Sequence, residues 1–547
     1  MNRFYNSENK RITLALFIYF TFGCLLVPFY RYSQRGDIVS YLSISEKYIN
    51  GNLSDAINGV WSPLLSWLLI PVFWVNVEIL LGFKILQLII GLFILFTVSK
   101  YYKLFGSKNE SSHYLLLATT SIIIYYFAFF LGSPDLLVAA FLLYYLYYSS
   151  KKEYLTSKAA GWVCGLVGAI AFYSKAFSLP FFVFHFALIN AFYFYRFPSH
   201  RSNIRKNYLQ GFGLFILLCS IWIVLISLKY GYFTYSTAGG YNFNIIGPKY
   251  ESVNTFRINS LYPPANATAV SYWEDPTFLP VERWNPFVPI SNLVYFVEHI
   301  LNNIVLMLYY IFLFSPFLLL LVIFKYNRKL SPILVISLVS IITYSLGYIM
   351  LFIYERFIIL IYLLVVVISF WLMINLIDSL KKSRLIKIIL LSVFIISLVV
   401  RPIYSTIKYF DEGSDLNILA QYLELKKISG RYAGISNKPL DFDWSNTIFL
   451  AYRTKSQFYG EINADQEIDR IYEELKKYDI NYLFDWRTDA KIIHHNFEEV
   501  FELKFANKEE NPFNKIVTAI DFLKLINRSG NQRITGSYVK VYKMIYQ

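Results

Sequence analysis

Cysteine and histidine are scarce in this chain of 547 residues, which contains three cysteines and six histidines. Cys24, Cys164 and Cys219 all fall within apolar segments, where a thiol packs as a small apolar group. The only adjacent histidines are His494-His495, and neighbouring side chains point in different directions. These features argue against a disulfide framework and against a structural zinc site.

Charged residues are also few. They make up 16% of the chain, against about 25% in an average soluble protein. Hydrophobic residues make up 56%, and apolar runs recur at a length of about 20 residues, enough to cross a hydrocarbon core of about 30 Å. We therefore predict an all-α, polytopic membrane bundle rather than a soluble protein. About eleven spans are expected, near 11–30, 77–99, 112–130, 135–150, 159–174, 179–195, 208–228, 293–324, 332–353, 357–377 and 386–401.

The net charge of +15 is concentrated in short loops. With eleven spans these are the alternate loops, all on one side of the membrane, which is the positive-inside pattern. We therefore expect a cytoplasmic N-terminus and an extracytoplasmic C-terminus, in a bacterial inner membrane, and no nucleic-acid partner. The loop cations are Lys100, Lys103, Lys108, Lys151, Lys152, Lys158, Arg196, Arg201, Arg205, Lys206, Lys325, Arg328, Lys329, Lys381, Lys382, Arg384 and Lys387.

The composition changes near Arg401-Pro402, beyond which polar residues increase and no span remains. We predict a transmembrane domain over 1–401 and an extracytoplasmic α/β domain over 402–547, because helical and strand patterns alternate there. The expected helices are 415–427 and 465–478, and the expected strands are 431–435, 447–452, 481–486 and 538–545.

Two long loops are predicted on the extracytoplasmic side, over 31–76 and 229–290. In the first, residues 38–49 have apolar side chains at helical spacing, which predicts a helix lying at the membrane interface. The second is rich in Gly, Asn, Pro and Tyr, and its aromatic residues favour an ordered role covering a ligand. The alternative is a simple extramembrane cap.

Charged residues gather at the extracytoplasmic ends of the predicted spans. A hydrophobic bundle with carboxylates and cations at one rim is typical of a membrane protein that handles a polar or charged substrate. The other interpretation is that these are solvated anchoring charges. The candidates are Asp37, Asp135, Lys175, Glu274, Asp275, Glu355 and Arg356.

The segments that carry these residues resemble loop motifs of membrane glycosyltransferases of the GT-C class. They look like those of the bacterial family-39 group, which is related to protein O-mannosyltransferases and aminoarabinose transferases. The resemblance covers roughly residues 11–400, and the Asp37 segment is its most specific part. The matching segments are Arg35–Tyr41, Ala56–Leu64, Ser133–Leu137, Tyr173–Ala176, Phe233–Gly239 and Tyr354–Phe357.

The resemblance implies a sugar donor on a polyprenyl phosphate and an extracytoplasmic lipid, glycan or protein acceptor. Lys175 and Arg356 would bind the donor phosphate, since both side chains are phosphate ligands. Asp37 would be the general base that takes the proton of the acceptor hydroxyl. Phosphate leaves as a stable anion, so the reaction needs no second carboxylic acid, unlike glycoside hydrolysis. Direct attack would invert the anomeric centre.

The remaining carboxylates have two open interpretations. Asp135, Glu274, Asp275 and Glu355 could hydrogen-bond substrate, and carboxylates of this kind could instead hold a divalent metal, so the metal is left undecided and no other cofactor is expected. Two other functions are considered: a polyprenyl-diphosphate-dependent glycan polymerase or ligase, and a lipid or sugar transporter. Transporters place charges near the bilayer midplane in broken helices, whereas the spans here are almost free of charge.

Overall fold

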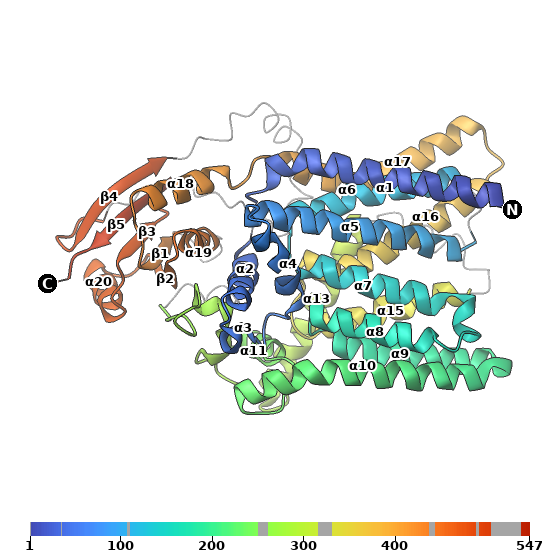
Figure 1. The fold of residues 1–547 in the computed structure, drawn as a ribbon, viewed down its shortest axis with the longest axis horizontal. Coiled ribbons are helices and arrows are strands. Elements are labelled where there is room, and N and C mark those ends of the chain that lie inside the picture. Colours follow the sequence, from blue (N-terminus) through green and yellow to red (C-terminus); the bar gives the residue numbers. More distant parts are fainter. Residues whose placement is uncertain are drawn as a thin grey trace.

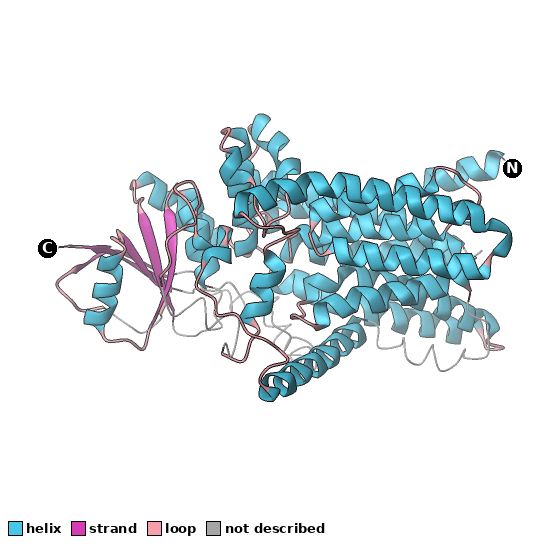
Figure 2. Ribbon diagram, turned by 90° about the horizontal axis from the view of Figure 1, so that it is seen from below, coloured by secondary structure: helices cyan, strands magenta, loops and turns pink. Residues whose placement is uncertain are grey.

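The computed structural model describes residues 2–33, 35–106, 110–249, 261–314, 331–436, 443–487, 492–504 and 538–546. A long bundle of roughly parallel and antiparallel helices forms one end of the molecule, and a small sheet forms the other (Figures 1 and 2). Short helices lie between the two parts, where α2, α3 and α11 are labelled in Figure 1.

The bundle helices contain long apolar runs, and glycine or proline occurs mainly near their ends or at helix contacts. Ser331 begins α15 by accepting a hydrogen bond from the Leu334 amide, with Pro332 in the first turn, the usual arrangement at a helix start. Gly231 ends α10 in the left-handed conformation, which glycine adopts without strain. The helices are α1 (Asn2–Tyr30), α5 (Ile79–Leu104), α6 (Glu110–Phe130), α7 (Pro134–Ser150), α8 (Ala160–Ser174), α9 (Ser178–Arg196), α10 (Arg201–Tyr230), α13 (Ile290–Phe314), α15 (Pro332–Ile349), α16 (Ile359–Ser379) and α17 (Arg384–Lys408).

Nine helices within the described residues are long and apolar enough to cross a membrane. In the apolar segment that contains α16, 89% of the residues are buried, so this helix runs through the centre of the bundle. The corresponding segments of α1, α10, α13 and α17 are only 17–28% buried. Exposed apolar side chains on these outer helices suit contact with lipid tails.

The predicted fold class is confirmed as a mostly helical multi-pass membrane bundle with a small sheet near the C-terminus. The count of eleven spans stays a prediction, because α7 and α8 are only 17 and 15 residues long. The predicted span 293–324 is described only as far as Phe314, and its remaining residues lie outside the described part of the chain. The domain boundary at 401 also stays a prediction; α17 continues through Pro402 to Lys408.

The first long loop folds into α2 (Gly36–Ile49), α3 (Leu53–Ala56) and α4 (Leu64–Trp74). The helix expected over 38–49 is therefore present, and its position at the membrane interface stays a prediction. Residues 38–45 of α2 are all buried, because α4 and α19 (Asp443–Arg453) pack against this helix. The second long loop contributes α11 (Ala238–Ile245) and the 3₁₀ turns η3 (Tyr272–Glu274) and η4 (Pro276–Phe278).

The C-terminal sheet has five strands in the order β2-β1-β3-β5-β4. Strand β1 pairs in parallel with β2 and β3, and β5 pairs antiparallel with β3 and β4. Tyr432 of β1 faces Phe458 of β2 and Tyr482 of β3. The strands are β1 (Arg431–Ser436), β2 (Gln457–Asn463), β3 (Tyr482–Asp485), β4 (Phe497–Lys504) and β5 (Tyr538–Met544), and the helices are α18 (Ser414–Leu425), α19 and α20 (Ile468–Lys477).

The α/β prediction for this part is correct in type, and one of its elements is wrong. Residues 447–452, expected as a strand, belong to α19. These residues are all buried, so the apolar run lacks the alternation that separates a strand from a buried helix. Strands β2 and β4 were not predicted.

Candidate functional site

Four of the predicted residues form one charged cluster at the end of the bundle that faces the sheet. The Arg356 guanidinium donates a hydrogen bond to Asp37 Oδ2, and its Nε lies 3.9 Å from Asp135 Oδ2. The Lys175 ammonium donates to Asp135 Oδ1. The cluster therefore alternates anion, cation, anion and cation, from four separate parts of the chain.

Helix termini place these side chains together. Asp37 lies in the first turn of α2, Lys175 directly follows α8, and Arg356 lies in the 3₁₀ turn η5 (Glu355–Ile358) that leads into α16. Asp135 lies in the first turn of α7. Both carboxylates therefore lie at a helix N-terminus, where the positive ends of the peptide dipoles point.

The start of α7 shows how the sequence fixes Asp135. Ser133 accepts a hydrogen bond from the Asp135 amide at 3.2 Å and donates its hydroxyl to Asp135 Oδ2 at 2.8 Å. Pro134 occupies the first helical turn, where its missing N–H costs nothing. The Ser-Pro-Asp sequence therefore starts the helix and directs the carboxylate toward the two cations.

The side chains of the cluster differ in their exposure to solvent. The Asp135 side chain is only 3% exposed, whereas Lys175 and Arg356 are 23% and 21% exposed. The buried carboxylate holds both cations, whose remaining N–H groups stay accessible to an anionic ligand. Arg356 has five N–H donors in a planar fork, so one edge can bind a carboxylate while another binds a phosphate.

Aromatic rings surround the Lys175 ammonium. Its Nζ lies 3.9 Å from the centre of the Phe357 ring and 5.4 Å from that of Tyr348, within the range of cation–π attraction. Burial lowers the pKa of Lys175, and the Asp135 carboxylate opposes this shift without cancelling it. The ammonium is therefore easier to deprotonate than that of a free lysine.

Trp273, one of the aromatic residues for which a ligand-covering role was predicted in the second long loop, is also part of this site. Its indole Nε1 donates to Asp37 Oδ1 at 2.9 Å, so Arg356 and Trp273 contact different oxygens of the same carboxylate. Trp61 donates its own indole N–H to the Trp273 carbonyl at 3.3 Å. The sequence signal was the concentration of aromatic residues in the second long loop.

Glu274 lies next to this cluster but is already paired. Its carboxylate is 2% exposed and accepts a hydrogen bond from Lys47 of α2. Asn58 donates to the Glu274 carbonyl at 2.8 Å. Glu274 therefore joins the second long loop to the first, and Lys47 is a residue that the sequence analysis missed.

Asp275 and Glu355 also have protein partners. Asp275 accepts a hydrogen bond from the Tyr230 hydroxyl at 2.6 Å and from the Thr277 hydroxyl at 2.5 Å. Glu355 accepts from Arg401 of α17, in a pair whose side chains are only 6% and 5% exposed. The Glu355–Arg401 ion pair holds the turn η5 against α17, and Arg356 is the next residue in this turn. Arg401, which marked only a change in composition, was missed as part of this arrangement.

A divalent metal does not fit the described carboxylates well. Within the described ranges, three or more His, Cys, Asp or Glu side chains never converge in a way that could hold a metal ion. Asp37, Asp135, Glu274 and Glu355 each face a cationic side chain instead. The arrangement suits binding of an anion better than binding of a cation.

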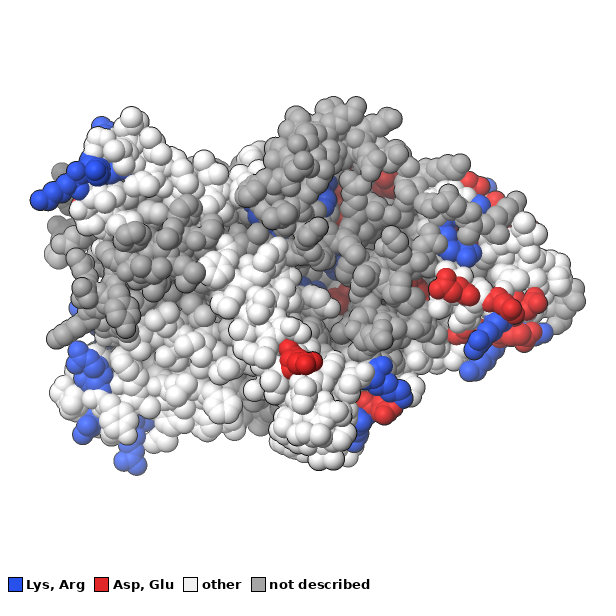
Figure 3. Space-filling view, turned by 180° about the vertical axis from the view of Figure 1, so that it is seen from behind, with Lys and Arg blue, Asp and Glu red and all other residues white. Residues whose placement is uncertain are grey.

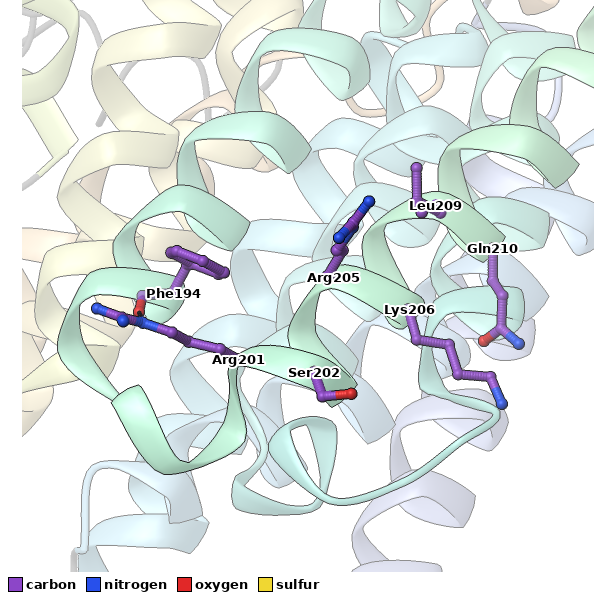
Figure 4. A pocket seen from close by; sticks show the side chains of 7 residues that line it. All are labelled: Phe194, Arg201, Ser202, Arg205, Lys206, Leu209 and Gln210. Carbon is purple, nitrogen blue, oxygen red and sulfur yellow. Dashed lines mark hydrogen bonds between the residues drawn. The ribbon is translucent and has the colours of Figure 1, made fainter.

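The opposite end of the bundle has a different character. Figure 3 shows only cationic side chains at that end of the visible face, whereas acidic and basic side chains mix at the sheet end. A cavity of about 590 Å³ opens there beside α9 and α10, and its lining is shown in Figure 4. It is lined by Phe194, Arg201, Ser202, Arg205, Lys206, Leu209 and Gln210, a set without a carboxylate to accept a proton.

No protein-family model matches the chain, and no curated protein matches it. Solved structures of membrane transferases are similar to it. The crystal structure of ArnT from Cupriavidus metallidurans bound to undecaprenyl phosphate is 11% identical, with a TM-score of 0.46, over 86% of this chain and 92% of that chain. The archaeal oligosaccharyltransferase AglB from Archaeoglobus fulgidus, in complex with an inhibitory peptide and a dolichol-phosphate, is 11% identical, with a TM-score of 0.47, over 87% of this chain and 69% of that chain. Both are GT-C membrane glycosyltransferases, the class whose loop motifs this sequence resembles.

Proposed function

We propose that the protein is a glycosyltransferase that moves a sugar from a polyprenyl-phosphate donor to an acceptor hydroxyl on the extracytoplasmic face. The cluster of Asp37, Arg356, Asp135 and Lys175 is the observation that carries this proposal. It combines a carboxylate that can accept a proton with two accessible cations that can bind a phosphate, at the end of an apolar bundle.

The cluster divides into a donor side and an acceptor side. Lys175 and Arg356 bind the phosphate oxygens, and Asp135 keeps the two cations in place and limits their repulsion. The lipid tail of the donor remains among the apolar outer faces of the bundle. ArnT and AglB, to which this chain is similar, were solved with undecaprenyl phosphate and a dolichol-phosphate, ligands of the same chemical kind.

Asp37 acts as the general base in this proposal. As the acceptor oxygen attacks the anomeric carbon, its proton moves to the Asp37 carboxylate, the bond from the anomeric carbon to the phosphate oxygen breaks, and the phosphate leaves with the electron pair. Arg356 contacts both the base and the leaving group, so it can stabilise the charge that develops on the phosphate. A single direct displacement inverts the anomeric configuration.

Asp37→Asn tests this assignment, because it preserves the size of the side chain and removes the proton acceptor. We expect kcat for sugar transfer to fall by about 10²–10⁴-fold, the usual contribution of a general base. Binding of unglycosylated polyprenyl phosphate should change little, since Lys175 and Arg356 remain. The assay uses purified protein, a panel of radiolabelled polyprenyl-phosphate monosaccharides, and membrane extract as the source of acceptor.

Asp378→Asn is the matched control, because Asp378 is an exposed aspartate near the far end of α16. It should leave kcat unchanged. Near-normal turnover of folded Asp37→Asn protein would remove Asp37 from the mechanism. Failure of the wild-type protein to bind polyprenyl phosphate at all would overturn the donor assignment.

A further inference from the structure

The segment over residues 261–275 connects the C-terminal sheet to the charged cluster. Strand β2 is the edge strand of the sheet, and an edge strand has backbone groups that need partners. Tyr262 donates its amide to the Tyr459 carbonyl at 2.7 Å, and Phe458 donates its amide to the Val270 carbonyl at 2.7 Å. Ser271 forms a parallel bridge with Phe458. The segment is therefore attached to the edge of the sheet by backbone hydrogen bonds, although it forms no strand of its own.

Two side chains of the C-terminal part strengthen this attachment. Gln457 donates its amide to the carbonyls of Ala267 and Ala269, at 3.2 and 3.3 Å. Glu474 of α20 accepts a hydrogen bond from the Leu261 amide at 3.1 Å. Glu474 therefore holds the start of the segment, and Gln457 holds it between the two backbone hydrogen bonds at Tyr262 and Val270.

The attached segment leads directly to the base. Ser271 bridges β2 and also accepts a hydrogen bond from the Trp273 amide at 3.2 Å, which starts the turn η3. Trp273 then donates its indole N–H to Asp37 Oδ1. On the far side of the turn, Lys47 holds Glu274. The position of the indole is therefore set by the sheet on one side and by α2 on the other.

We propose that the C-terminal sheet is a positioning element for the reaction: its edge strand β2 holds residues 261–271, and thereby keeps Trp273 in place to orient the Asp37 carboxylate. Gln457 and Glu474 are positioning residues in this arrangement, and Trp273 is the residue through which they act. The role assigned to Asp37 rests on the proposed function. A carboxylate with one fixed donor on each oxygen has a defined plane, and defined geometry is what general-base catalysis requires.

The double variant Gln457→Ala/Glu474→Ala removes both side-chain contacts and preserves the backbone pairing. Its matched control is Gln421→Ala/Glu473→Ala, which changes the same residue types at exposed positions of α18 and α20. Hydrogen exchange measured by mass spectrometry on the full-length protein should show peptides from 261–275 exchanging roughly tenfold faster in the first variant, which loses three hydrogen bonds to this segment. Unchanged exchange there, or equal acceleration in the control, would overturn the proposed attachment.

A double-mutant cycle with Trp273→Phe tests whether the effect reaches the base through the indole. Trp273→Phe keeps an aromatic ring and removes the N–H, and we expect kcat to fall roughly tenfold or more, with the affinity for polyprenyl phosphate unchanged. Gln457→Ala/Glu474→Ala should lower kcat in the wild-type background and have little further effect in Trp273→Phe. Fully additive losses would show that the sheet does not act through Trp273.

The two proposals fail in different ways. Hydrogen exchange requires no substrate, so normal exchange in the Gln457→Ala/Glu474→Ala variant counts against the positioning role whatever reaction is catalysed. An inert wild-type protein that shows the expected faster exchange in the variant counts against the proposed function and against the role of Asp37. Loss of polyprenyl-phosphate binding in the Gln457→Ala/Glu474→Ala variant would also contradict the positioning role, because Lys175 and Arg356 lie outside residues 261–275.

Discussion

Arg356 contacts Asp37 and approaches Asp135, while the Lys175 ammonium forms an ion pair with Asp135. The two cations therefore differ in what they can do. Arg356 remains charged at any accessible pH, and in the proposed function it would link the donor phosphate to the base. Lys175 is a titratable point charge whose pKa is lowered by burial, so its proposed contribution to phosphate binding should depend on pH.

We predict that the affinity for polyprenyl phosphate falls as the pH rises through the lowered pKa of Lys175. Lys175 is protonated below its pKa and neutral above it, so its attraction for the phosphate is lost as the pH rises. Because this pKa is lowered, binding should weaken at a lower pH than it would with an ordinary lysine, whose pKa is about 10.4. The measurement is the Kd between about pH 8 and 10.5, above the second phosphate pKa of about 6. Lys175→Arg should bind with a nearly flat profile over this range, and an equal fall in that variant would contradict the assignment.

At the scale of elements, α8, the helix that Lys175 follows, packs very closely against α10. A Cβ on Gly165 would be only 2.2 Å from the Gly211 carbonyl oxygen, and one on Gly161 only 2.1 Å from the Asn207 carbonyl oxygen. The two backbones therefore approach as closely as glycine permits, in the small-residue packing common between membrane helices. Lys175 directly follows α8, which also packs against α7, the helix that begins next to Asp135.

Gly165→Ala should force the two helices apart. We expect the free energy of unfolding to fall by about 1–3 kcal/mol, the usual cost of an extra methyl group in a filled interface, measured as a lower Tm in detergent. Gly213→Ala is the control on α10, because a Cβ there meets no atom within 4 Å. It should not lower the Tm. Equal destabilisation by both changes would contradict the close-approach explanation, because alanine favours a helix more than glycine does and Gly213 has room for a Cβ.

At the scale of the whole molecule, the two ends of the bundle differ in charge and in structure. The cationic end lies far from the sheet (Figures 1 and 3). Helix α2, whose first turn contains Asp37, lies beside the sheet (Figure 1). Under the positive-inside rule the cationic end is cytoplasmic. The cluster, the second long loop and the C-terminal sheet are then all on the extracytoplasmic side.

This orientation predicts the result of a reporter fusion. An alkaline phosphatase that is active only outside the cytoplasm should be active when it is fused after Gln547. The same reporter placed after Lys382, in the exposed turn between α16 and α17, should be inactive. The reverse pair of results would show the opposite topology. The charged cluster would then face the cytoplasm, which would contradict the proposed transfer to an extracytoplasmic acceptor.

The sequence by itself determined the membrane class and most of the bundle helices. The length of an apolar run is a local property that can be compared directly with bilayer thickness. The Ser133-Pro134-Asp135 helix start is also local, as is the helix over residues 38–49. The charge of the loops depends only on composition and order, so the expected orientation could be derived without a structure.

Only the tertiary structure decided which charges meet. Asp37 and Arg356 are 319 positions apart, and their contact depends on how the ends of α2 and η5 come together. The same packing placed Glu274 against Lys47 and Glu355 against Arg401, and it made residues 447–452 a buried helix. A sequence pattern describes the neighbours along the chain, whereas the ion pairs and burial that define this site arise between elements that are distant in the chain.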